Sequence, residues 1–303
     1  MTKVERLLAN INLFIQKAEE NEDAFIDSLP DAPELEEIPG LVGEFEKMTA
    51  KLLRQQRKLF LDELKAFIAK DDEETLGAML NYFQNDLFAA DEFAILFGAE
   101  AAVFLKNTTE SLSKIIMASI DKDVAFNVLS KRTTDWIESW SEELAEIMKL
   151  NTHKAIETQL IEAISAGESI AQVELRLKDM PEFDRKRARA TARTEVLTAS
   201  SRANFESFSQ SPAVVGKKWK HSGFAKTSPR MAHVAMDGVV VGVDEYFDID
   251  GEEGLYPRDT SFSAQNRINC GCVMGPVVDE KIIGLSQEEK EAIRQEVLEE
   301  LNS

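Results

Sequence analysis

Residues 214–274, VVGKKWKHSGFAKTSPRMAHVAMDGVVVGVDEYFDIDGEEGLYPRDTSFSAQNRINCGCVM, decide the fold class. They contain two of the three histidines and both cysteines of the chain. Before this stretch, apolar residues recur at helical spacing; within it, the spacing becomes short and strand-like and turn residues crowd together. The sequence therefore predicts a mainly α protein with a C-terminal α+β module: a long helical N-terminal region followed by a compact domain with a small sheet.

The pattern inside this stretch predicts short strands separated by turns. A first strand is expected at 214–219, a short helix at 229–236, a second strand at 239–243 and a last strand at 268–274. Asp237-Gly238 and Asp250-Gly251 are typical turn pairs because glycine tolerates positive φ.

Upstream, the apolar stripes predict helix after helix. Asp121–Asp123 and Lys131–Thr134 are candidate breaks, and Gly167 is a natural residue to end a helix. Trp140 is expected in the core. The stripes consist of Leu53, Phe60, Leu64 and Phe67; Leu76, Leu80, Phe83 and Leu87; Leu112, Ile116 and Ile120; Ile137, Trp140, Leu144 and Ile147; and Ile156, Leu160 and Ile164.

Four segments follow from these patterns. We expect an N-terminal helix and an acidic, proline-rich linker over 1–40, a helical region over 41–180, an α+β module over 181–276, and an acidic C-terminal helix over 277–303. Ser286 and Glu289 form a capping-box sequence at the start of that last helix. Its narrow apolar stripe, Ile293, Val297 and Leu301, is expected to pack on the body or on another subunit.

Charge divides the chain. Its net charge is −20, which argues against a general nucleic-acid coat because a negative field repels phosphate. Residues 181–230, however, carry 11 Lys and Arg against 4 Asp and Glu, a net +7. The first residues lack the pattern of a secretion signal, and the most apolar run, 93–105, is too short to span a bilayer. Two cysteines one residue apart do not make a disulfide framework, which fits synthesis in a reducing cytoplasm.

The helix predicted over 184–208 carries the positive charge in a ridge. Beside a stripe of small residues that would let another backbone approach, Arg185, Arg189 and Arg193 recur every four residues. The ridge is either a solvated face paired with the acidic remainder or a contact strip for DNA phosphate or an acidic partner. In the second case the contact residues would be Arg185, Arg189, Arg193, Lys217, Lys218 and Lys220.

One group has the chemistry of a metal site. His221, His233, Cys270 and Cys272 would suffice for tetrahedral zinc, although the spacing of the cysteines is unusual. The alternatives are two buried thiols that act as small apolar side chains, or a cysteine nucleophile with His233 and Asn266 or Asn269. The common phosphate-binding, nucleophile-elbow and metalloprotease motifs are missing, so the sequence indicates no enzyme and requires no cofactor.

Several short sequence elements, taken in their order along the chain, indicate a resemblance to a known family. They are Ala192-Arg193-Thr194-Glu195, Lys218-Trp219, Arg230-x-x-His233 with Gly238 behind it, Phe247, Pro257, and Asn269-Cys270-x-Cys272. Over residues 184–274 the chain resembles the head-morphogenesis family of tailed phages typified by protein F of bacteriophage Mu. It departs from the family pattern at Thr227 and Ser228, where an acidic residue is common, and at Gly271, where a basic residue is common.

The resemblance implies a minor head protein of a tailed bacteriophage. Such proteins associate with the portal vertex inside the capsid and act in head assembly or in DNA packaging or ejection, and they are not generally enzymes. The implied partners are the portal protein, capsid and scaffold proteins and phage DNA, with no membrane; the implied location is the virion, and the host cytoplasm during assembly. The signature residues, expected to hold the domain together, are Trp219, Arg230, His233, Gly238, Asn269, Cys270 and Cys272.

Two hypotheses remain for these residues. Arg230 and His233 share one face of a short helix and can hydrogen-bond carbonyls or side chains of the last strand, including Asn269. That arrangement would lock two ends of a small domain together. The alternative is a hydrolase-like or transferase-like centre that uses Arg230, His233 and Cys270.

Overall fold

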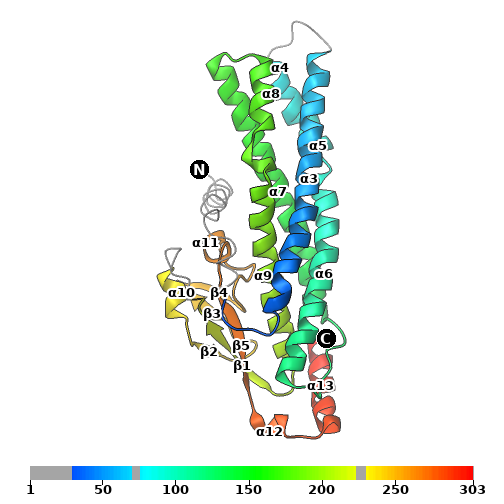
Figure 1. Ribbon diagram of the computed structural model, residues 1–303, viewed down its shortest axis with the longest axis vertical. Helices are drawn as coiled ribbons and strands as arrows, with labels where there is room; N and C mark the ends of the chain where they lie inside the picture. Colours follow the sequence, from blue (N-terminus) through cyan, green and yellow to red (C-terminus); the bar gives the residue numbers. More distant parts are fainter. Residues whose placement is uncertain (1–28, 70–75, 223–229, 303) are drawn as a thin grey trace. The chain divides into compact units, whose positions relative to one another are not determined.

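The protein is mainly helical and carries small antiparallel sheets in its C-terminal part, as a computed structural model shows (Figure 1). The structure describes residues 29–69, 76–222 and 230–302. This arrangement confirms the predicted fold class. The helix predicted before residue 29 lies outside the described residues.

The chain divides into two compact units. Unit 1 comprises Met1–Gly43, Val103–Glu138 and Ala192–Ser303, and unit 2 comprises Glu44–Ala102 and Ser139–Thr191. This division differs from the boundaries at 40, 180 and 276 that the sequence suggests. The reason is that long helices supply residues to both cores. They are α3 (Ile38–Ile68), α6 (Phe93–Ile120), α7 (Lys131–Ala166) and α9 (Arg185–Gln210).

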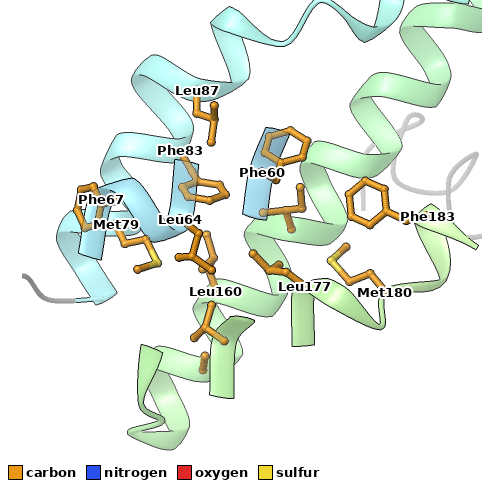
Figure 2. Packing of buried hydrophobic residues seen from close by; sticks show 13 residues of the cluster. Phe60, Leu64, Phe67, Met79, Phe83, Leu87, Leu160, Leu177, Met180 and Phe183 are labelled. Atoms are coloured by element: carbon orange, nitrogen blue, oxygen red, sulfur yellow. The ribbon is translucent and has the colours of Figure 1, made fainter. Parts of the chain in front are cut away.

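An apolar cluster forms the core of unit 2. Phe60, Leu64 and Phe67, the predicted stripe of α3, are buried against side chains from the following helices. Figure 2 shows these side chains pointing toward one another between the helices. The Phe60 and Phe83 rings stack with their centroids 6.0 Å apart. The partner elements are α4 (Leu76–Tyr82), the π-helical η3 (Phe83–Leu87), α5 (Phe88–Ala90), α7, α8 (Ile170–Lys178) and η4 (Pro181–Phe183).

Three helix boundaries differ from the predicted ones or sharpen them. α3 begins at Ile38 after a short 3-10 turn, η2 (Leu35–Glu37), so it starts inside the predicted linker. Pro39 is tolerated there because the first turn of a helix needs no donor from its backbone nitrogen. α7 begins at Lys131, where a break was expected, and continues to Ala166. Gly167 follows it with φ +63°, as predicted.

Glu206 explains why α7 starts where it does. The buried Glu206 carboxylate accepts hydrogen bonds from the Ser130 backbone N–H, the Ser130 hydroxyl and the Thr133 hydroxyl. Ser130 precedes α7, and its hydroxyl accepts from the Thr133 N–H in the first turn, where N–H groups have no partner within the helix. A carboxylate from α9, distant in sequence, therefore holds the residue that caps the helix.

The small-residue stripe of α9 lets α6 approach closely within unit 1. Ala192, Val196, Ala199 and Ala203 are fully buried. The Ser113 hydroxyl of α6 donates to the Ala203 carbonyl at 3.4 Å, and the Ser207 hydroxyl donates to the Ser113 carbonyl at 3.2 Å. These contacts between side chain and backbone confirm the predicted close packing.

The main sheet has β1 (Val214–Lys220) at its centre, between β2 (Val240–Val241) and β5 (Val273–Val278), both antiparallel to it. β3 (Phe247–Ile249) and β4 (Glu252–Gly254) form a separate hairpin around the predicted Asp250-Gly251 turn. The first strand is thus confirmed. The second is shorter than predicted.

The prediction for the last strand is wrong by several residues. β5 begins only at Val273, so both cysteines precede it in the connection from α11 (Ala264–Arg267). Asn269 has φ +57°, a left-handed conformation that interrupts an extended strand. The cysteines are therefore held by a turn rather than by a regular strand.

The C-terminal elements are α12 (Glu280–Ile283) and α13 (Gln287–Asn302). Ser286 and Glu289 make the predicted capping box, with the hydroxyl and the carboxylate bonded to each other at 2.6 Å. Beside the half-buried apolar stripe, the side chains of Lys290 and Arg294 are almost fully buried. Lys290 pairs with Asp121 at 2.8 Å, which ties α13 to the turn after α6.

Candidate functional site

Three chemically active side chains meet in unit 1. His233 lies on the short helix α10 (Met231–Ala235), and Cys270 and Cys272 lie in the turn before β5. The His233 Nδ1 atom is 3.5 Å from Cys270 Sγ and 3.6 Å from Cys272 Sγ. Each of the three residues exposes at most 3% of its surface. They form the group of potential metal ligands found among the described residues.

The other ring nitrogen of His233 fixes how the imidazole is oriented. His233 Nε2 lies 3.2 Å from the Asn266 side-chain oxygen, and the Asn266 amide donates to Glu252 at 3.1 Å. The amide nitrogen of Asn266 donates to the Glu252 carboxylate. The side-chain oxygen of Asn266 therefore faces the His233 ring, and an amide oxygen can only accept a hydrogen bond. Nε2 therefore carries a proton, and Nδ1 is the ring nitrogen that faces the two sulfurs.

Glu252 is held in its ionised form. Burial opposes this, but hydrogen bonds from Ser263 and then Asn266 keep the pKa of Glu252 below its ordinary value. The backbone N–H of Ser263 donates to this carboxylate at 2.8 Å. The hairpin strand β4, which carries Glu252, thereby sets the orientation of a ring on α10.

Two arginines hold the backbone around the cysteines. Arg258 donates to the carbonyl oxygens of Cys270 and Cys272 at 2.6 and 2.7 Å, and its other terminal nitrogen donates to Ser201 at 2.6 Å. Arg230 donates to the Ile268 carbonyl at 2.6 Å. Both guanidinium groups are largely buried, and this desolvation lowers the pKa of each. The turn with the cysteines is therefore clamped from two sides.

The pKa values of the two thiols are shifted in opposite directions. The hydrogen bond with Cys272, then that with His233 and the charge of Arg258, lower the pKa of Cys270 well below its ordinary value. The same hydrogen bond, with burial, raises the pKa of Cys272. Cys270 is thus the sulfur that carries negative charge most readily.

The remaining signature residues pack around this centre. Trp219 is fully buried, and its ring meets that of His233 edge-on, with the centroids 6.0 Å apart. Gly238 has φ +81° and its N–H donates to the Trp219 carbonyl, so glycine is required by the backbone conformation there. Asn269 accepts a hydrogen bond from Arg193. His233 contacts the side chain of Asn266, whereas the sequence suggested Asn269. Arg230 donates to the Ile268 carbonyl just before the cysteines, as expected.

His221 does not join the group. It follows the end of β1, and its backbone N–H donates to the Asp237 carboxylate at 2.8 Å. The potential ligand group within the described residues consists of His233, Cys270 and Cys272 without it. Of the four residues predicted as possible zinc ligands, the structure thus brings three together and leaves His221 outside.

The predicted contact residues for DNA do not form one exposed strip. In unit 2, Arg185 and Arg189 both pair with Glu46, at 2.5 and 2.7 Å. In unit 1, Arg193 bonds Asn269, Lys217 is fully buried, and Lys220 donates to the Asp31 carbonyl. Lys218 is exposed. The pairing of Arg185 and Arg189 follows the first of the two predicted alternatives, a ridge neutralised by acidic residues.

Several residues of the site had no signal in the sequence. Arg258 falls in an irregular segment and Glu252 in the three-residue strand β4, where no periodic pattern singles out one polar residue. Asn266, on the short helix α11, was considered only as a partner of His233 beside a cysteine nucleophile. Arg258 also has φ +67°, a left-handed conformation that the neighbouring residues do not predict. A buried polar contact in unit 2 was missed for the same reason: Asp91 lies 2.7 Å from His153 Nε2 and accepts from Gln56 at 2.6 Å.

A family model described as phage Mu protein F like protein matches residues 154–275. The chain is 54% identical over 301 residues to uncharacterized protein YqbB of Bacillus subtilis (strain 168), which covers 98% of this chain and 99% of that protein. The chain belongs to the phage Mu protein F-like family. The whole described site lies within the part that matches the family model.

More distant relatives cover parts of the chain. Minor head protein GP7 of Bacillus phage SPP1 is 29% identical over 145 residues, 44% of this chain and 47% of that protein. NAD(+)--arginine ADP-ribosyltransferase EFV of Enterococcus faecalis (strain ATCC 700802 / V583) is 29% identical over 167 residues, 54% of this chain and 31% of that protein. The chain thus spans less than half the length of these two relatives. No solved structure matches significantly.

The described helices lack the properties of membrane-spanning segments. Among the described residues, no helix has both the length and the apolar character that crossing a bilayer requires.

Proposed function

We propose that the protein is a minor head protein of a tailed bacteriophage, which associates with the portal and acts in head assembly and in packaging or ejection of DNA. The observation that carries the proposal is the match of residues 154–275 to the phage Mu protein F-like family, joined by the similarity to a protein named minor head protein. Portal, capsid and scaffold proteins are the proposed partners, and the virion is the proposed location.

The chemistry of the site supports a structural role for the module. Arg230 and Arg258 use their donors on backbone carbonyls, and His233 is engaged by Asn266 and the two sulfurs. A catalytic group needs a free path to substrate, whereas the ring of His233 and both thiols are buried. These contacts join α10, the hairpin and the turn before β5 into one body, as a protein that bears load in a capsid requires.

The similarity to the ADP-ribosyltransferase does not favour an enzyme. It involves 31% of that protein at 29% identity, and the printed name describes the whole protein. We therefore propose a non-catalytic function.

Coexpression with a portal protein of a related phage tests the proposal. We expect the protein to co-sediment with portal oligomers, and mass spectrometry of purified virions to detect it in few copies relative to the major capsid protein. A particle lacking the protein should show fewer filled heads or lower infectivity. If the protein ignores portal oligomers and is absent from virions, the proposal fails.

A matched pair of variants separates assembly from catalysis. His233→Gln removes a candidate catalytic residue, while His221→Gln changes a histidine outside the ligand group. Provided circular dichroism shows both variants folded, we expect both to support head assembly. Loss of infectivity for folded His233→Gln particles that assemble normally would point to an enzyme instead.

A further inference from the structure

We propose that His233, Cys270 and Cys272 are three ligands of a structural zinc ion in the phage Mu protein F-like module. Thiolate sulfur and neutral imidazole nitrogen are the donors that zinc prefers in structural sites. The three ligand atoms lie within 4.8 Å of one another. This inference concerns the stability of the module and holds whether or not the protein binds a portal.

The distances between donors already fit a tetrahedral ion. With Zn–S near 2.3 Å and Zn–N near 2.0 Å, two donors at a tetrahedral angle lie about 3.6 Å apart. The observed separations from His233 Nδ1 are 3.5 Å to Cys270 Sγ and 3.6 Å to Cys272 Sγ. An ion at their centre would therefore require little movement of the ring or of either sulfur.

The surroundings of His233 are those of a metal ligand. A ligating histidine commonly donates its second N–H to an oxygen that fixes the tautomer and the ring plane. Asn266 supplies this oxygen, and ionised Glu252 in turn holds Asn266. The result is a lone pair on Nδ1 directed toward both sulfurs.

The turn with the cysteines is shaped in advance. Arg258 binds the carbonyl oxygens on both sides of Gly271, and Asn269 turns the chain in a left-handed conformation. These contacts bring both sulfurs to the same side, although the residues are only two apart. The unusual spacing is thus accommodated by the clamp.

Charge also favours the ion. Zinc binds thiolates, and two thiolates balance its two positive charges. A structural zinc ion takes four protein ligands, so the fourth would come from a side chain outside this group.

Metal analysis of the full-length protein tests the proposal. After purification without chelator and extensive dialysis, we expect inductively coupled plasma mass spectrometry to detect one zinc ion per chain. Substitution by Co²⁺ should give sulfur-to-cobalt charge-transfer absorption and the visible bands of a tetrahedral ion. Removing the metal with a strong chelator should lower the melting temperature, and adding zinc back should restore it.

Variants distinguish the ligands from their neighbours. Cys270→Ser, Cys272→Ser and His233→Gln should each lose the bound metal, whereas His221→Gln should keep it. Asn266→Ala removes the group that orients His233 and should weaken zinc binding about 10-fold to 100-fold without abolishing it. Because the ligand variants can fail to fold, the cobalt spectrum of the unmodified chain serves as the independent measurement.

Several outcomes would overturn the proposal. Folded protein that retains no zinc and gives no charge-transfer band with Co²⁺ would do so. So would a count of free thiols that reveals a Cys270–Cys272 disulfide in the purified chain. Equal loss of metal in the His221→Gln and His233→Gln variants would contradict the assignment of three ligands.

Discussion

The ammonium nitrogen of Lys217 lies 4.9 Å from the centroid of the Phe205 ring, in the interior of unit 1. The Phe247 ring lies on another side, 5.3 Å from the same nitrogen. Lys217 is fully buried, and its ammonium has no hydrogen-bond partner among the described residues. The ring faces compensate only part of the hydration that the buried ammonium loses.

This environment predicts that stability rises with pH. Burial lowers the pKa of Lys217 to about 8, against the opposing charges of Asp244 and Asp259. Between that value and about 10.4 in the unfolded chain, the unfolded state binds the extra proton. The free energy of unfolding should therefore increase from pH 8 to pH 10, by an amount on the order of 3 kcal/mol over the full window.

Urea denaturation at pH 7.5 and at pH 10 measures this effect. Lys217→Met keeps the length of the side chain and removes the titrating group, so it should lose the increase. Lys218→Met changes the exposed neighbour and should retain it. Equal pH dependence in both variants would show that another group is responsible.

Arg258→Met should destabilise unit 1. The substitution leaves the carbonyl oxygens of Cys270 and Cys272 and the hydroxyl of Ser201 without their donor. Loss of one partner from a buried charged network costs about 3–5 kcal/mol. Lysine at this position should rescue little, because it cannot serve the three acceptors with a rigid fork. Chemical denaturation should place Arg54→Met, at an exposed side chain of α3, within about 0.5 kcal/mol of the unmodified chain.

The core of unit 2 should respond to loss of volume. Leu64 is fully buried in the apolar cluster, and Leu64→Ala should cost about 2–5 kcal/mol. Leu175→Ala makes the same chemical change at a side chain that is 60% exposed, and we expect less than about 0.5 kcal/mol. Thermal unfolding monitored by circular dichroism compares the two. Similar losses would mean that the cluster does not form the core.

Glu46 should contribute to stability in a pH-dependent way. Burial opposes ionisation, but hydrogen bonds from Arg189 and Arg185 lower the pKa of Glu46. A lowered carboxyl pKa gives stability that is present above the unfolded value, about 4.3, and is lost as the pH falls through the folded value. In the Glu46→Gln variant, the free energy of unfolding should therefore fall less as the pH is lowered below about 4.3. Glu142→Gln, at an exposed residue of α7, should leave this pH dependence unchanged.

The same pairing predicts weak attraction for DNA. Since Glu46 neutralises Arg185 and Arg189, the unmodified protein should show no strong shift of duplex DNA in a gel assay at low salt. Binding that weakens steeply with salt and disappears in an Arg185→Ala, Arg189→Ala variant would contradict this expectation and support the contact-strip hypothesis.

The sequence predicted best where one pattern repeats over many residues. The stripe of Phe60, Leu64 and Phe67 lies buried as expected, because a helix with such a stripe gains stability only when that face leaves water. The small residues of α9 behave in the same way. The first strand, the turn at Asp250-Gly251 and the capping box of α13 also follow from local chemistry.

The sequence predicted least where one polar residue acts at a distance. Glu206 holds Ser130, the capping residue of α7, from 76 positions further along the chain, so the apparent break at Lys131 is instead the first turn of α7. No local preference reveals this contact. The same holds for Lys290, whose burial depends on Asp121.

By itself, the sequence determined the helical character of the chain, the position of the small sheet and the resemblance to the phage Mu protein F-like family, since each depends on local spacing. Only the tertiary structure decided which polar residues meet. It brought His233, Cys270 and Cys272 together without His221, and it supplied Arg258 and Asn266 to hold them. The physical reason is that the pairing of buried donors and acceptors is set by three-dimensional packing, for which sequence separation carries no information.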